Sequence, residues 1–246
     1  MMLCRIAVTR ALAAILLVLT MRVAASAQSL SVLPVNIFMA PGQQASSLTV
    51  TNLGSTSTSI QIRAYAWNQD GDKDILSPSD QVIASPPIAT IAAGASQVVR
   101  LVLRERPPAR ESTFRILLDQ IPPASSEAGV VHVVLRLSIP IFAQPPARVN
   151  PDVQFHLEAQ GGEMYLVGIN NGRRHMAIRE VELSTSDGRK LETAAGSSPY
   201  ILAGVTRHWK IDAKGGPLPQ LNEKLQLKAQ SDAGAIEQQV SVVGAP

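Results

Sequence analysis

The pattern of apolar and polar residues predicts β-structure along almost the whole chain. Apolar and polar positions alternate with a period of two, and β-branched residues are frequent, in a series of short segments. Four clear examples are residues 46–52, 58–68, 96–104 and 113–121. Turn-forming pairs such as Pro41-Gly42 and Asp70-Gly71 separate the segments. Short strands with frequent turns are typical of an antiparallel sandwich, so we expect an all-β protein.

A proline-rich stretch divides the chain into two parts. Residues 144–151 read QPPARVNP, with three prolines in eight positions, which indicates a stiff connector. Strand-like alternation resumes after it and continues to the end of the chain. The sequence therefore predicts two β-sandwich domains, residues 28–144 and 151–246, joined by a linker at residues 145–150.

The longest apolar alternation, VVHVVLRLSIPIF at Val130–Phe142, raises the question of what its apolar side chains pack against. Every second position is apolar: Val131, Val133, Leu135, Leu137, Ile139 and Ile141. Such residues share one face of a strand, and on the residues alone that face is most simply the buried side of a sandwich. Pro140 lies on the other face, and a proline inside a strand favours a sheet edge because it lacks a donor.

The first 27 residues have the layout of a secretory signal peptide. Arg5 and Arg10 supply a basic start, Ala11–Thr20 is a short apolar run, and Ala25-Ser26-Ala27 has the form of a cleavage site. The alternative, an uncleaved anchor helix, is disfavoured because the apolar run is too short to cross a bilayer. We expect cleavage after Ala27 and an exported, periplasmic or extracellular product.

Removal of the signal changes the charge balance. Arg5, Arg10 and Arg22 account for three of the 22 basic residues, so the remaining 19 equal the 19 acids. A net charge near zero gives no reason to expect nucleic acid as a partner. The single cysteine, Cys4, also lies in the signal, so packed cores rather than disulfides must stabilise the product.

No pattern in the chain points to catalysis, a cofactor or a metal. The four histidines are scattered singly, and no G-x-S-x-G or glycine-rich phosphate loop occurs. The acids at Asp70, Asp72 and Asp74 have the start of a calcium-loop spacing. Ile75 and Gln81, however, stand where that loop needs glycine and glutamate, so an acidic hairpin turn is the favoured interpretation.

Several segments resemble the N-terminal domain of periplasmic pilus chaperones, the PapD-like proteins of chaperone–usher secretion. In chain order they are SLSVLPVNIFMAPGQQASSLTVTN, SPPIATIAAGASQVVRLVLR, RESTFRILLDQIPP and VVHVVLRLSIPIF. They cover most of the first predicted domain. In the second domain the resemblance is looser and rests on SPYILAGVTRHWKI and AQSDAG.

The resemblance implies two immunoglobulin-like β-sandwich domains in an L-shaped arrangement. It also implies that the last strand of the first domain is lent to an incomplete subunit, which is donor-strand complementation. The donor side chains would be Val131, Val133, Leu135 and Leu137. The expected function is that of a periplasmic chaperone which holds pilin-like or coat-protein-like subunits and delivers them to an outer-membrane usher.

The sequence departs from the family pattern at two places. Family members anchor a subunit carboxylate with an arginine and a lysine, but Asn36 and Pro140 stand at those positions. At the domain junction Glu111 and Asp232 match the family's acids, whereas Gln144 replaces its arginine. Two acids without a cation would repel, so we expect a hinge that is more hydrogen-bonded or more mobile.

Two rival functions and one further partner stay open at this level. The chain could instead be a structural subunit or surface adhesin of a secreted fibre, or a periplasmic enzyme or ligand-binding protein. An exposed apolar strand also invites pairing with a second copy, so the free protein is expected to form a weak dimer through Val131–Leu137.

Overall fold

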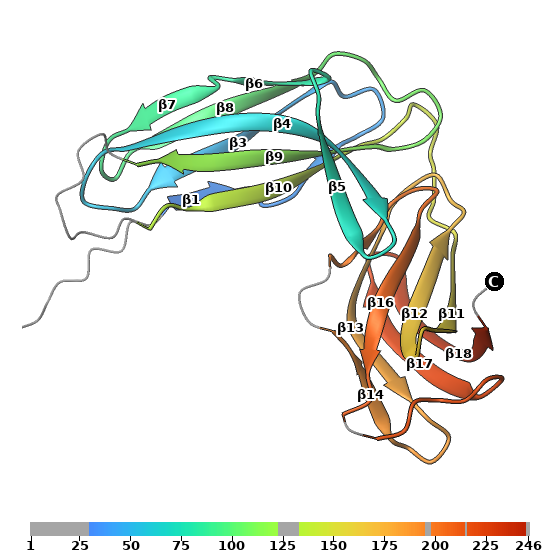
Figure 1. Cartoon of the computed structure of the whole chain (residues 1–246). Coiled ribbons are helices and arrows are strands. Elements are labelled where there is room, and N and C mark those ends of the chain that lie inside the picture. The colour runs from blue at the N-terminus through green and yellow to red at the C-terminus, as the bar shows by residue number, and fades with distance from the viewer. Residues whose placement is uncertain (1–29, 123–132, 195–197, 215, 245–246) are drawn as a thin grey trace, which may run out of the picture.

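The computed structural model describes residues 30–122, 133–194, 198–214 and 216–244. All the regular structure in these ranges is β, in eighteen strands, and it forms two immunoglobulin-like sandwiches, as the sequence predicted. Figure 1 shows the two bodies meeting at an elbow, so that the chain has the outline of an L. The predicted signal peptide and the donor residue Val131 lie outside the described residues.

The first body is a sandwich of two sheets. One sheet has the order β1 (Leu30–Leu33), β3 (Ala45–Asn52), β8 (Ser96–Leu103) and β6 (Val82–Ser85). The other has the order β2 (Ile37–Met39), β10 (Arg136–Ala143), β9 (Ser112–Ile121), β4 (Thr58–Asp70) and β5 (Lys73–Pro78), and β7 (Ile88–Ile91) also pairs with β4. The first strand segment thus starts in one sheet as β1 and continues in the other as β2.

The period-two alternation in the sequence fills the space between these sheets. Ile60 and Ile62 on β4 and Ile116 on β9 point inward and are at most 3% exposed. They pack with Val50 and Leu101 from the opposite sheet. Each inward residue is flanked by residues that face outward, which is how strands with one buried face are built.

The second body is a single sheet whose strand path closes on itself. Its order is β14 (Lys190–Thr193), β16 (Thr206–Asp212), β12 (Glu163–Asn170), β11 (Val153–Gln160), β18 (Gly234–Gly244), β17 (Lys224–Ser231), β13 (Met176–Ser184) and β15 (Tyr200–Ile201), and β14 also pairs with β13. Leu157, Leu227 and Val242 belong to its core. Closure leaves less strand edge exposed here than in the first body.

A cluster of aromatic side chains joins the two bodies. Trp67 from β4 and Phe142 from β10 pack with Tyr200 and Leu202 of the second body. The ring of His175, in the loop before β13, stacks on Phe142 with 3.7 Å between centroids and 17° between planes. Because Phe142 belongs to β10, this contact fixes that strand relative to the second body.

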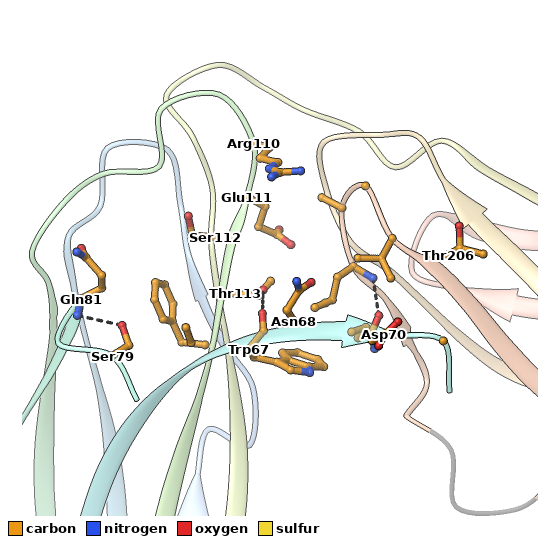
Figure 2. A pocket seen from close by; sticks show the side chains of 18 of the residues that line it. Trp67, Asn68, Asp70, Ser79, Gln81, Arg110, Glu111, Ser112, Thr113 and Thr206 are labelled. Carbon is orange, nitrogen blue, oxygen red and sulfur yellow. Dashed lines mark hydrogen bonds between the residues drawn. The ribbon is translucent and has the colours of Figure 1, made fainter. Parts of the chain in front are cut away.

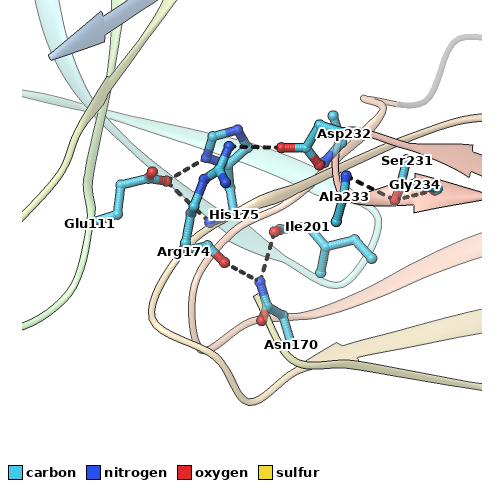
Figure 3. Close-up of polar contacts among 10 residues, drawn as sticks. Glu111, Asn170, Arg174, His175, Ile201, Ser231, Asp232, Ala233 and Gly234 are labelled. Atoms are coloured by element: carbon cyan, nitrogen blue, oxygen red, sulfur yellow. Dashed lines mark hydrogen bonds and ion pairs between the residues drawn. The ribbon is translucent and has the colours of Figure 1, made fainter. Parts of the chain in front are cut away.

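A buried glutamate–histidine pair crosses the junction beside this cluster (Figure 3). Glu111, just before β9, accepts hydrogen bonds through Oε1 from Nδ1 of His175 at 2.6 Å and from its main-chain N–H at 3.2 Å. Both side chains are at most 1% exposed. A carboxyl acceptor and a ring donor at this distance, away from water, form a directional link between the two bodies.

The β4–β5 hairpin makes the second crossing. It turns through Gly71, at φ 56°, and Asp72, so the acidic hairpin predicted from the sequence is confirmed. Asp74 lies 3.2 Å from the guanidinium of Arg115 on β9 and 3.6 Å from that of Arg207 on β16. Burial lowers the pKa of Arg207, while Asp74 and Asp72 act in the opposite direction. The hairpin thus places the Asp74 carboxyl group beside Arg207, a buried arginine of the second body.

The two acids at the junction have partners, so they are not left to repel each other. Glu111 is bonded to His175, and Asp232 accepts from Arg174 at 3.0 Å and from the main-chain N–H of Ala177 at 3.0 Å. All of these Asp232 contacts lie within the second body. Gln144 donates its main-chain N–H to the carbonyl of Met39 at 3.0 Å. Residues of the second body therefore supply the positive or donor groups that position 144 lacks.

The first core predicts a large cost for truncating Ile116, which is fully buried at the centre of β9. Ile116→Ala should lower the free energy of unfolding by about 2–5 kcal/mol because it leaves a cavity. Amide hydrogen exchange in increasing urea, followed at Leu118 on β9 and at Leu225 on β17, measures the two bodies separately. Leu227→Ala, in the second core, is the control; an equal effect of this control at Leu118 would contradict two separate cores.

The glutamate–histidine pair predicts that the junction depends on Glu111. Glu111→Ala leaves two buried donors of His175 without their acceptor and should cost about 1–3 kcal/mol. The matched control is Glu192→Ala, which removes an exposed partner of Lys214 and should cost less than about 1 kcal/mol. Thermal unfolding of both variants distinguishes them, and equal midpoints would contradict a stabilising role for the buried pair.

Candidate functional site

The strand β10 has a complete neighbour on one side only. It pairs with β9 along its whole length, from Arg136 opposite Asp119 to Ala143 opposite Ser112. On its other side β2 pairs with it only at Ile141–Ala143. Across the described ranges, no other strand pairs with Arg136–Pro140 on that side. We call this side of Arg136–Pro140 the open edge.

The alternation of main-chain groups shows what the open edge presents. The carbonyl of Leu135 accepts a hydrogen bond from the N–H of Gln120 on β9, whereas the N–H of Gln144 donates to Met39 on the β2 side. Successive strand residues direct their N–H and C=O groups to opposite sides. The even-numbered Arg136, Ser138 and Pro140 therefore face the open edge. Because its main-chain nitrogen faces away from β9, Pro140 removes no hydrogen bond between β9 and β10, which explains why the strand tolerates a proline.

The apolar face of β10 changes from buried to exposed along the strand. Ile141 and Ile139 are 0% and 4% exposed and belong to the first core. Leu137 and Leu135 are half-buried, and Val133 is 83% exposed. Side chains of the same alternation are thus buried in the core at Ile139 and Ile141 and exposed to solvent at Val133.

The strand is shorter than the sequence pattern predicted. β10 begins at Arg136, while the alternation begins at Val130. The described residues just before it, Val133–Leu135, are not in a strand. Val133 and Val134 are exposed, so the part of the alternation that the structure describes leaves the core before the strand begins.

Further apolar side chains are exposed on the segment that leads into β2, and sequence analysis missed them. Leu33, Val35 and Phe38 are all more than half exposed. Phe38 lies opposite Phe142 in the β2–β10 pairing, and their rings are 5.5 Å apart between centroids. The alternation in LPVNIF gives no signal for them, because it places the exposed Leu33 and Val35 in the same pattern as the buried Ile37.

Asn36 and Pro140, the two positions without the family's cations, lie at the end of the open edge. Oδ1 of Asn36 accepts a hydrogen bond from the Tyr200 hydroxyl at 3.3 Å. Burial raises the pKa of Tyr200, while Arg115 and Arg179 act in the opposite direction. The residue opposite Pro140 on β9 is Arg115. Its guanidinium already contacts Asp74 and lies 3.7 Å from the Trp67 ring centroid.

A polar cavity of about 750 Å³ lies between the two bodies, on elements other than β10 (Figure 2). The end of β4, the start of β9 and residues 202–206 contribute to its lining. In the parts of the chain that the structure covers, no group of three or more His, Cys, Asp or Glu side chains is placed to hold a metal. The same residues include no helix long and apolar enough to cross a membrane.

Comparison with known proteins gives matches concentrated in the first body. Residues 29–148, close to half of the chain, match the family model of the pili and flagellar-assembly chaperone PapD N-terminal domain. The chaperone protein PapD of Escherichia coli is 38% identical over 90 residues, which cover 34% of this chain and 36% of that protein. The chaperone protein PmfD of Proteus mirabilis is 34% identical over 104 residues, covering 40% and 39%.

The matched segments thus span well under half the length of these relatives, but the structural likeness covers both bodies. A solved structure from Acinetobacter baumannii, the chaperone–tip adhesion subunit pre-assembly complex CsuC–CsuE of archaic Csu pili, matches with a TM-score of 0.64. The identity is 22%, and the match covers 89% of this chain and 100% of that one, which shows a shared fold. Residues 29–148 are thus similar to the N-terminal domain of PapD-like pilus-assembly chaperones.

Proposed function

We propose that this protein is a periplasmic chaperone that captures pilin-like or coat-protein-like subunits by strand addition and delivers them to an outer-membrane usher. One observation carries the proposal: β10 has an open edge next to an apolar face that extends out of the core. The similarity of residues 29–148 to the PapD N-terminal domain and the shared fold support it. An edge strand of this kind can pair with an extended segment of another protein, which is β-augmentation.

Main-chain and side-chain contacts both have to contribute to capture. Full burial of a Val or Leu side chain stabilises a complex by roughly 1.5–3 kcal/mol. Val133, Leu135 and Leu137 are the exposed or half-buried candidates among the described residues. Association costs ~4–15 kcal/mol, so these side chains together leave a net gain near zero. Main-chain hydrogen bonds at the open edge, at about 0.5–1.5 kcal/mol each, supply the remainder.

The position of β2 limits where a captured strand can lie. β2 occupies the edge from Ile141 onward, so pairing by a client strand ends at Pro140, beside Asn36. Neither residue offers a cation, and Arg115 across from Pro140 is already paired with Asp74. We therefore infer that the client is held mainly by its strand and less by a charged terminus. Val131, if it continues the alternation, would extend the apolar contact upstream.

The exposed apolar face predicts that Val133→Asp abolishes capture. A buried carboxylate replaces a favourable apolar contact, so recovery of the client should fall by at least about tenfold. The measurement is co-purification of small β-rich secreted proteins with the tagged protein from the native periplasm. Val98→Asp is the control, because Val98 is 57% exposed on β8 in the opposite sheet.

Either of two outcomes would contradict capture at this strand: equal recovery with Val133→Asp, or equal loss with the control. Sedimentation of the free protein and Val133→Asp also tests self-pairing at the same face. A wild-type dimer that the substitution dissociates would support it, and a monomer at high concentration in both would exclude it.

The proposed location predicts processing of the N-terminus. The basic start, short apolar run and Ala25-Ser26-Ala27 should direct export, with cleavage after Ala27. Intact-mass measurement of protein released from the periplasm should give a chain that begins at Gln28. Retention of residues 1–27 on protein found in the membrane fraction would contradict the prediction.

A further inference from the structure

Two consecutive residues of β9, Asp119 and Gln120, bind the chain where β10 begins. β9 continues to Ile121, which pairs with Ser59 of β4. The pairing of β10 with β9, in contrast, starts at Arg136. Asp119 and Gln120 contact the chain at this place, one through a charged group and the other through an amide. The separation of the two strands therefore coincides with a set of polar contacts.

Asp119 connects three adjacent strands. Oδ1 accepts from Nε of Arg136 on β10, and Oδ2 accepts from Arg63 on β4 at 2.6 Å. The Asp119 side chain is 16% exposed. Burial raises the pKa of Asp119, but the hydrogen bonds from Arg136 and Arg63 outweigh it and hold the pKa below its ordinary value. The carboxylate is thus ionised at neutral pH and accepts two charge-assisted bonds.

Gln120 binds both main-chain groups of Leu135, the residue before Arg136. Its N–H donates to the carbonyl of Leu135 at 2.9 Å, and its side-chain Oε1 accepts from the N–H of Leu135 at 3.3 Å. Its Nε2 donates to Thr58 Oγ1 on β4 at 2.9 Å. Gln120 is itself buried. The amide side chain therefore takes a ladder position that is normally filled by main chain.

We propose that Asp119 and Gln120, with Arg63, form a latch that fixes where the lent segment leaves the sandwich. The latch holds Leu135 and Arg136 to β9, so that Arg136–Pro140 stays an ordered template, while Val133 projects beyond it. These are positioning residues, since they act through Leu135 and Arg136 and do not touch the client. The inference rests on the proposed function only where it concerns client capture. There, an ordered template lowers the entropy lost on binding.

The burial pattern indicates why a latch is needed at this end of β10. Ile139 and Ile141 anchor the strand in the core, whereas Leu137 and Leu135 are half-buried. Main-chain bonds at a strand end with few core contacts open easily. The Arg136 side chain is 63% exposed, whereas that of Asp119 is 16% exposed. The latch bonds are lost both when this end of β10 opens and when the first body unfolds, so removing them should speed exchange here and leave the second body unchanged.

The test measures the amide exchange of Leu137 in the free protein. As an odd-numbered residue, Leu137 directs its N–H to β9, so its exchange reports opening of this end. Asp119→Asn and Arg136→Gln should each increase the exchange rate by about tenfold, while exchange of the buried Leu225 on β17, in the second body, stays unchanged. Arg136→Lys keeps the charge and should restore slow exchange. Glu237→Gln is the control, because it removes an exposed cross-strand partner of Lys228 at 3.2 Å.

Unchanged exchange of Leu137 in both latch variants would overturn the proposal, as would an equal increase at Leu225 in the second body. Client affinity provides the second readout, with an expected loss of about fivefold in the latch variants. If the wild type binds no client while latch variants still exchange faster, the proposed function fails and the latch stands. If Val133→Asp abolishes capture but Leu137 exchange is unchanged, the function stands and the latch fails.

Discussion

The main-chain donors and acceptors of every strand need hydrogen-bond partners, and the two bodies differ in how far their own strands supply these partners. In the second body the strand path closes, so most of these groups find partners within the sheet. In the first body the opening segment changes sheets between β1 and β2, and β2 covers only three residues of β10. The uncovered stretch is where the first body is chemically incomplete. An added strand would complete it, and this links the topology to capture.

The junction gives this edge a fixed place in the molecule. Phe142, two residues after Pro140, stacks on His175, and His175 is held by Glu111. Asn36, just before β2, receives a hydrogen bond from Tyr200. The end of the open edge therefore lies against the second body, at the elbow shown in Figure 1. A client strand that follows the edge would reach that elbow.

Local pattern was sufficient for the all-β fold and the hairpin at Gly71-Asp72, because both depend on residues adjacent in sequence. It could not show that one alternation serves two purposes, with Ile139 in the core and Val133 in solvent, since periodicity reports a shared face but not what covers it. The start of β10 at Arg136 depends on Asp119 and Gln120, which lie on another strand. Likewise, Glu111 and His175 meet across 64 positions of sequence, without any local signal.

The central claim is that a client pairs with the main chain of the open edge, and amide exchange of Arg136 and Ser138 in the purified complex tests it most directly. Both N–H groups face away from β9, so they should exchange fast in the free protein. Strong protection of both on client binding, with little change at Val98, is the result the account predicts. Fast exchange of both amides in a stable complex would contradict strand addition at β10.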